Sequence, residues 1–165
     1  MTTSYFAGIG ARTTPQDTLL EMYDIGVELA KQGYILRSGG AIGADQTFQD
    51  GVESVKGHAD VYLAKHANEA AEAIAAEYHP AWERCNSFVR KLHARNAMIL
   101  LGPDLCDPVD FVVCWTPGGM VIGGTGQSMR MAVGLDIEVV NLAVNQWVQP
   151  KRVVHPHSRG KLRLV

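Results

Sequence analysis

Two glycine-rich segments provide the chemistry that this sequence indicates most clearly. The first, at 38–45, reads Ser-Gly-Gly-Ala-Ile-Gly-Ala-Asp and follows the apolar run at 34–36. The second, at 116–127, follows the apolar run at 111–115. Glycine lets the backbone turn tightly and approach a ligand closely, while the N-terminus of a following helix offers unpaired N–H groups and a partial positive charge. Two such segments, each between a strand and a helix, predict a site for a nucleotide or another phosphate-bearing ligand.

The elements that position these segments alternate along the chain. We expect strands at 4–9, 34–37, 59–63, 111–115 and 137–142, because each run is short, apolar and bounded by turn residues. Helical spacing or propensity predicts one helix that opens at Thr14-Pro15 and closes at Gly33, and others at 46–55, 67–77, 87–101 and 127–133. This alternation predicts an α/β fold: a single Rossmann-like domain with a mostly parallel sheet, helices on both faces and a site at one sheet edge.

Length and charge limit the domain organisation. The chain has 165 residues, of which 47% are hydrophobic, and a formal net charge of only −2. We expect one domain at 1–148 and a basic C-terminal tail at 149–165, because residues 143–165 hold five cations and no carboxylate. The tail is either a solvated or subunit-packing terminus or a DNA-binding segment. The overall charge gives no general attraction to nucleic acid or to anionic membranes.

The cysteines and histidines show no familiar spacing. Cys85, Cys106 and Cys114 form no CxxC pair, and the six histidines show no HExxH or comparable pattern. We therefore expect no disulfide framework, no metal site and no cofactor. The sequence also has no signal-like segment and no apolar run of about 18 residues that could cross a bilayer, so we expect a cytoplasmic protein without a membrane partner.

Three segments resemble a known superfamily. Residues 37–48 are similar to the SGxAxGID stretch of the DNA-processing protein A family. Residues 92–98 resemble the MHxRKxxM segment, and residues 123–130 the GGxGTxxE segment, of the Lonely Guy cytokinin-activating enzymes. The resemblance covers most of residues 4–142. It implies a Rossmann-like domain of the SLOG superfamily, to which both families belong.

This chain differs from the Lonely Guy segments at positions that serve catalysis in those enzymes. In the Lonely Guy enzymes, the arginine and the glutamate serve phosphoribohydrolase chemistry, which breaks the N-glycosidic bond of a nucleoside monophosphate. Arg95 matches the arginine, but Arg130 stands at the glutamate position and Gln127 at the threonine position. A cation cannot activate water or stabilise an oxocarbenium ion as a carboxylate does. We expect Arg130 in the first turn of its helix, where it favours anion binding instead.

The candidate site thus joins both glycine-rich segments to three arginines. A guanidinium can hold a phosphate with two parallel hydrogen bonds. As catalytic residues we expect Arg95 and Asp45. The expected ligand- and phosphate-binding residues are Gly10, Arg12, Ser38, Gly39, Gly40, Gly43, Arg95, Gly118, Gly119, Gly123, Gly124, Thr125, Gly126, Gln127 and Arg130.

Several of these residues have a structural alternative. Gly10 and Arg12 belong either to an incomplete dinucleotide fingerprint or to a plain strand-to-helix turn. Asp45 either caps the following helix or contacts a ribose hydroxyl, and Arg130 either binds phosphate or lies solvated on the surface. Since residues two apart on a helix do not share a face, we expect only Arg95, and not His93, to reach the site.

Three functions follow from these observations. The first is binding of a nucleotide, or of an NAD-like or ADP-ribose-like signal, for sensing or sequestration. The second is a nucleotide N-glycosidase that uses Arg95 with a carboxylate such as Asp45 or Glu83. The third is single-stranded DNA binding, which the neutral-to-acidic charge disfavours. The resemblance also implies a homo-oligomer, a dimer or larger, for which the apolar faces around Leu92 and Met98 are candidates.

Overall fold

The fold is a single α/β domain built on a five-stranded parallel sheet. The computed structural model describes residues 2–151, so most of the predicted tail, 152–165, lies outside the described residues. The sheet has the order β3-β2-β1-β4-β5, and all four neighbouring pairs are parallel. The strands are β1 (Ser4–Gly8), β2 (Tyr34–Ser38), β3 (Ala59–Val61), β4 (Phe111–Cys114) and β5 (Glu138–Asn141). The predicted Rossmann-like class is confirmed.

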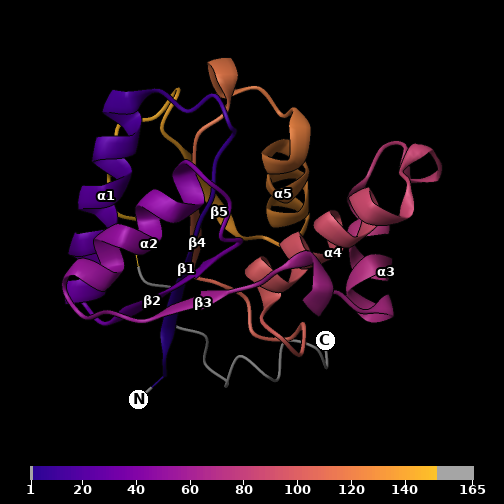
Figure 1. Ribbon diagram of the computed structural model, residues 1–165, viewed down its shortest axis with the longest axis horizontal. Coiled ribbons are helices and arrows are strands. Elements are labelled where there is room, and N and C mark those ends of the chain that lie inside the picture. The colour runs from indigo at the N-terminus through magenta and orange to yellow at the C-terminus, as the bar shows by residue number, and fades with distance from the viewer. Residues whose placement is uncertain (1, 152–165) are drawn as a thin grey trace.

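Helices cover both faces of this sheet. They are α1 (Gln16–Lys31), α2 (Ala44–Ser54), α3 (Glu69–Tyr78), α4 (Ser87–Leu101) and α5 (Gly123–Gly134), with short 3₁₀ turns η1 (Ala64–His66), η2 (Trp82–Arg84) and η3 (Pro117–Gly119). Helices α1 and α2 lie together on one side of the sheet, and α3, α4 and α5 lie on the other (Figure 1). Within residues 2–151, no helix combines the length and the apolarity needed to cross a membrane.

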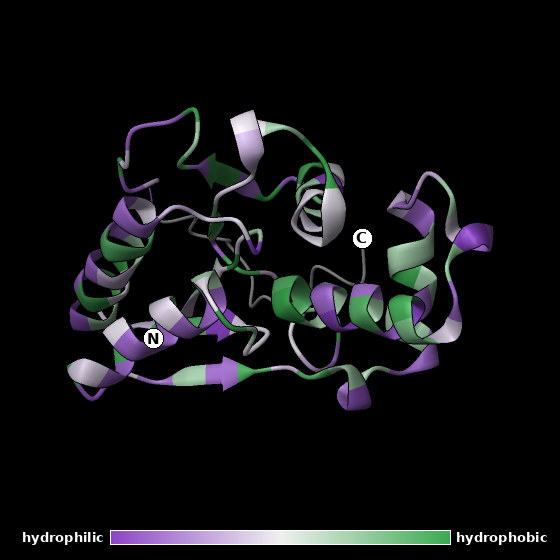
Figure 2. Cartoon of the chain, turned by 45° about the horizontal axis from the view of Figure 1, so that its top comes forward, coloured by the Kyte–Doolittle hydropathy of each residue, from purple (hydrophilic) through white to green (hydrophobic). Residues whose placement is uncertain are grey.

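The strand side chains divide between the two faces as a period of two requires. Phe6, Phe111 and Val113 point to the core under α1 and α2, whereas Ala7 and Val112 point to the core under α4 and α5. β4 is buried on both faces and is apolar throughout, whereas β2 and β5 include polar residues such as Arg37 and Glu138. Helices such as α1 mix hydrophobic and hydrophilic positions (Figure 2).

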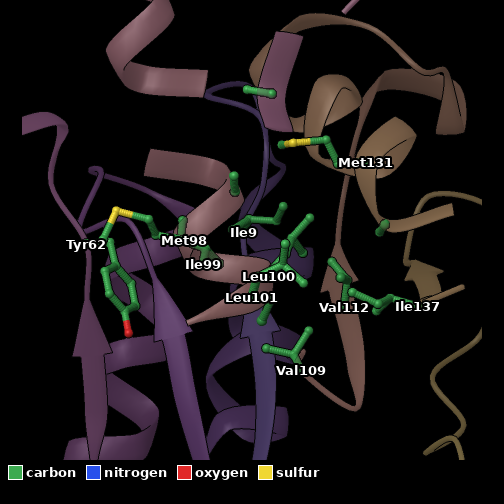
Figure 3. Packing of buried hydrophobic residues seen from close by; sticks show 14 of the residues in the cluster. Ile9, Tyr62, Met98, Ile99, Leu100, Leu101, Val109, Val112, Met131 and Ile137 are labelled. Atoms are coloured by element: carbon green, nitrogen blue, oxygen red, sulfur yellow. The ribbon is translucent and has the colours of Figure 1, made fainter. Parts of the chain in front are cut away.

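The core under α4 and α5 joins the last turns of α4 to the sheet. Met98, Ile99, Leu100 and Leu101 of α4 pack with residues of the strands and of α5, as Figure 3 shows. Met98 is only 5% exposed, so it is part of this core. The expectation that Met98 contributes to an exposed dimer face is therefore wrong.

The order in which strands are added to the sheet changes direction between β1 and β4. It runs outward from β1 through β2 to β3, returns through α3 and α4, and then continues through β4 to β5 on the other side. The loops after β1 and β4 consequently diverge from each other, and such a switch point opens a crevice at the carboxyl edge of a parallel sheet. The candidate pocket lies at this crevice.

The face under α1 and α2 depends on close helix packing. A Cβ at Gly51 of α2 would meet the carbonyl oxygen of Tyr23 in α1, and a Cβ at Gly26 of α1 would lie 2.8 Å from the carbonyl oxygen of Phe48. The backbones of α1 and α2 are thus too close at these two positions for any residue larger than glycine.

We predict that Gly51→Ala lowers the free energy of unfolding by about 1–3 kcal/mol, because overpacking outweighs the gain of about 1 kcal/mol in helix propensity. Urea denaturation followed by circular dichroism measures this change. Gly124→Ala is the matched control, since nothing lies within 4 Å of a Cβ there. Equal stabilisation of both variants would contradict the close packing of α1 and α2.

Candidate functional site

A pocket of about 880 Å³ occupies the crevice at the carboxyl edge of the sheet. Its walls come from six places in the chain: the segments after β1, β2 and β3, His79 after α3, one side of α4, and the first two turns of α5. Parallel strands with right-handed crossovers bring all of these segments to one edge, although they are spread from residue 9 to residue 130.

About half of the predicted site residues line this pocket. Those that do are Gly10, Arg12, Asp45, Arg95, Gly123, Gly124, Thr125 and Arg130. The pocket lining does not include Ser38, Gly39, Gly40, Gly43, Gly118, Gly119, Gly126 or Gln127. Several glycines of the second group serve packing instead: a Cβ at Gly126 would lie 2.6 Å from the backbone of Val121.

The second glycine-rich segment forms the first turn of α5. We expected α5 to begin at 127, because glycine propensity disfavours a helical turn over 123–126, but it begins at Gly123. The backbone of Val121 lies so close to Gly126 that no side chain would fit there. The N–H group of Gly126 bonds to the carbonyl of Ile122, and no hydrogen-bond partner occurs within residues 2–151 for the N–H groups of Gly123, Gly124 and Thr125. These three donors lie at the pocket wall.

Hydrogen bonds hold the side chain of Arg130 near the N-terminus of α5. Because α5 begins early, Arg130 lies beyond the first turn, which corrects the predicted position. Its Nε and Nη2 donate to Oε1 of Gln127 at 3.0 and 2.8 Å, and its Nη1 donates to the carbonyl of Val121 at 3.4 Å. Gln127 is fully buried and its Nε2 donates to the carbonyl of Ala75. Gln127 therefore orients the guanidinium without lining the pocket.

The first glycine-rich segment is closed by its own aspartate. Oδ2 of Asp45 accepts hydrogen bonds from the N–H groups of Gly39 at 3.0 Å and Ala41 at 3.4 Å. Asp45 does not cap α2, whose N-cap residue is Gly43, so the expectation of a helix cap is wrong. Burial raises the pKa of the Asp45 carboxyl, against the opposing effect of the Ala41 amide and of Arg95. Two amides that were candidates for binding phosphate are thus occupied.

Arg95 crosses from α4 to hold the same segment from the other side. Its Nη1 donates to the carbonyl of Gly39 at 2.7 Å and to that of Tyr62 at 3.1 Å, and its Nε donates to Asn96. A Cβ at Gly39 would meet this guanidinium. Burial lowers the pKa of Arg95, opposed by the charge of Asp45. Arg95 therefore connects the ends of β2 and β3 to α4, and it also lines the pocket.

His93 reaches the pocket too, contrary to our expectation. Residues of an α-helix are about 100° apart, so positions two apart are separated by about 160° on the shorter side. The lining residues of α4 include Leu92 and Asn96 between His93 and Arg95. The pocket thus borders one broad side of α4, with His93 and Arg95 at its two edges.

A cluster of His79, Cys85 and His93 adjoins the pocket, and the sequence did not indicate it. The ring centroids of His79 and His93 are 4.9 Å apart, and Trp82 packs beside both rings. Burial, followed by the charges of His79 and Arg130, lowers the pKa of His93 to about 4, and burial also lowers the pKa of His79. The sequence feature that corresponds to this cluster is a cysteine with one histidine six residues before it and another eight residues after it, which matches no familiar metal-binding motif.

The charges at the pocket are mostly positive. Arg12 lies exposed at the rim, Arg95 and Arg130 lie at the walls, and the N-terminus of α5 adds a partial positive charge. Among the described residues, the only carboxylate that lines the pocket is that of Asp45, which is bonded to two amides. The arrangement favours a bound anion.

The fold and the site together define an α/β domain of the Rossmann-like class with an anion-favouring pocket at its topological switch point. Comparison of the chain with protein-family models, with curated proteins and with solved structures finds no match.

We predict that Asp45→Ala lowers the free energy of unfolding by about 2–3 kcal/mol, because two amides lose their acceptor, whereas Asp45→Asn costs about 1 kcal/mol or less since its amide oxygen can still accept. Urea denaturation of both variants tests this. An equal loss in the two variants would show that the charge next to Arg95, and not the acceptor, stabilises the segment.

Proposed function

We propose that this protein binds a phosphorylated nucleoside, such as a nucleotide or an NAD-like or ADP-ribose-like signal molecule, and that it senses or sequesters this ligand. The observation that carries the proposal is the N-terminus of α5, where three N–H groups without a protein partner border a pocket that Arg12 and Arg130 also line. A helix N-terminus of this kind is a ready site for phosphate.

The phosphate fits against Gly123 and Gly124. Nothing lies within 4 Å of a Cβ placed at either residue, so the backbone is open to a ligand on this side. Arg130 is held by Gln127 within the same wall, and this prior orientation lowers the entropy that binding costs. The positive helix end next to a guanidinium is unfavourable in an empty pocket, and a phosphate offsets it.

The nucleoside part fits against the apolar side of the pocket. Leu63, Phe88, Val89, Leu92 and Ile122 line it, and Phe88 is 64% exposed. A nucleobase can stack or pack on such side chains. The volume of about 880 Å³ lies within the range of about 300–1,000 Å³ that small-molecule sites occupy.

The resemblance to the Lonely Guy segments supports the same site. Residues 92–98 and 123–130, which carry that resemblance, both contribute several side chains or backbone groups to the pocket. Hydrolysis of the N-glycosidic bond is less well supported, because a carboxylate must reach the reacting carbon and Oδ2 of Asp45 is bonded to the N–H groups of Gly39 and Ala41. Binding without turnover is therefore the function we favour.

The first test uses a panel of nucleoside monophosphates, NAD and ADP-ribose. We predict that at least one ligand raises the melting temperature of the protein and is recovered intact by chromatography. Gly124→Val should abolish this shift without unfolding the domain, because the side chain fills open space next to the free amides. Lys91→Gln, which changes an exposed cation of α4 outside the pocket, is the control and should bind as the unchanged protein does.

Other outcomes would replace the proposal. Release of free base would identify an N-glycosidase. Affinity for single-stranded DNA that falls steeply with salt, without a response to any small ligand, would identify a DNA-binding protein. A Gly124→Val variant that binds normally would remove the α5 terminus from the site.

A second prediction concerns the contact between Gln127 and Arg130. We expect Arg130→Met to weaken binding of the identified ligand about 10–100-fold and Gln127→Met to weaken it by less, because the guanidinium remains but is no longer oriented. A double-mutant cycle on dissociation constants measures their coupling. Additive effects would show that Gln127 does not act through Arg130. Circular dichroism of each variant controls for unfolding.

A further inference from the structure

Three side chains of the kind that bind transition metals meet at one wall of the pocket. His79 follows α3, Cys85 follows η2 and His93 lies on α4. One ligand atom from each residue lies within 4.8 Å of the others, and Nε2 of His79 is 3.6 Å from Sγ of Cys85. Three separate elements, rather than one local motif, produce this cluster.

We propose that His79, Cys85 and His93 bind a transition-metal ion, with Zn²⁺ as the best match to two imidazoles and one thiolate. His79 and His93 line the pocket, whereas Cys85 does not. The ion therefore sits in the pocket wall, and its fourth coordination position faces the pocket, where a water molecule or a ligand oxygen completes a tetrahedron. Three protein ligands with one exchangeable position are typical of zinc sites that act on substrates.

The surroundings of His93 provide an independent observation. The residue is only 8% exposed, and its Nδ1 is buried without a hydrogen-bond partner within the described residues. Buried polar atoms almost always have a partner, so an orphaned imidazole nitrogen needs an explanation. Coordination of the ion through Nδ1 of His93 would give this nitrogen the partner that the described residues do not provide.

The segment that carries Cys85 is anchored on both sides. Before it, the guanidinium of Arg90 donates to the carbonyl of Trp82 at 3.3 and 3.0 Å and lies 5.2 Å from the ring centroid of Trp82. After it, Asn86 caps α4 by accepting a hydrogen bond from the N–H group of Val89. These contacts hold the loop against α4 and keep Cys85 close to His93.

Metal binding requires three local adjustments. Zinc bonds of about 2.0–2.3 Å place two nitrogens and one sulfur roughly 3.3–3.6 Å apart in a tetrahedron, so a pair of ligand atoms at the 4.8 Å limit must approach by up to about 1.5 Å. The Cys85 thiol releases its proton to solvent and loses the hydrogen bond that its Sγ donates to the carbonyl of Ala81 at 3.8 Å. In addition, Nδ1 of His79 accepts a hydrogen bond from the N–H group of Ala81 at 3.0 Å. A ring that binds metal through Nε2 carries its proton on Nδ1, so the Ala81 amide gives up this bond. These two lost hydrogen bonds are small beside the binding free energy of a zinc site.

The charge of Arg130 also bears on which ligands can hold a metal ion at this cluster. Arg130 acts electrostatically on both histidine rings, and a metal ion adds further positive charge. The thiolate of Cys85 supplies the negative charge that two neutral imidazoles lack. Replacement of Cys85 should therefore reduce metal affinity more than replacement of either histidine.

Titration of the reduced, metal-free full chain with Co²⁺ and Zn²⁺ tests the proposal without any nucleotide. We expect one ion per chain, a thiolate-to-Co²⁺ charge-transfer absorption, displacement of Co²⁺ by Zn²⁺, and a shift of the Ala81 amide resonance on binding. Cys85→Ser should abolish the charge-transfer band, and His79→Gln and His93→Gln should each weaken binding by more than the roughly 10–100-fold that loss of an outer-shell partner costs.

Matched controls separate this site from other ligands in the chain. Cys106→Ser changes a buried cysteine outside the cluster, and a joint change of His155 and His157 to glutamine removes the two histidines near the C-terminus. Both variants should bind Co²⁺ as the unchanged protein does. Absence of binding, a band that survives in Cys85→Ser, or a band lost in Cys106→Ser would each overturn the proposal. None of these outcomes depends on whether nucleotides bind.

Discussion

The peptide groups on either side of Gly39 connect the parts of the site more than any other contact does. Asp45 accepts from the N–H group of Gly39, and Arg95 donates to its carbonyl and to that of Tyr62. These bonds tie the ends of β2 and β3 to α2 on one face of the sheet and to α4 on the other. Because α4 also carries His93, the position of one pocket wall depends on this contact. A side chain at Gly39 would displace Arg95, which explains the need for glycine there.

The two glycine-rich segments are alike in sequence but differ in whether an acidic side chain of the chain itself accepts from their amides. In the first, an aspartate of the chain itself takes up two amides, as a bound anion would. In the second, no acidic side chain follows the glycines, and three amides at the start of α5 have no partner in the described part of the chain. Asp45 thus takes up two amides of the first segment, and no comparable carboxylate follows the glycines of the second.

Much of the fold was predictable because its signals are local. Apolar runs of strand length and helical spacing gave all five strands, the parallel sheet and its site-bearing edge. The start of α5 at Gly123 was not predictable, because glycine propensity disfavours a helical turn over 123–126. Nor could spacing reveal the bonds of Asp45 or the meeting of His79 with His93, since these depend on how α3 and α4 pack.

The charge on the α5 side of the pocket is linked to the protonation of the histidines on the opposite side. On α5, the helix terminus and Arg130 place positive charge where the only lining carboxylate among the described residues is already bonded. On the opposite side, burial, and after it nearby charge that includes the same guanidinium, lowers the pKa values of His79 and His93 and keeps both rings neutral. Neutral imidazoles do not add to the positive charge, and they keep the lone pairs that a metal requires. An anion between these walls would offset Arg130 on one side, and on the other its oxygen is a suitable fourth ligand for an ion held by Cys85.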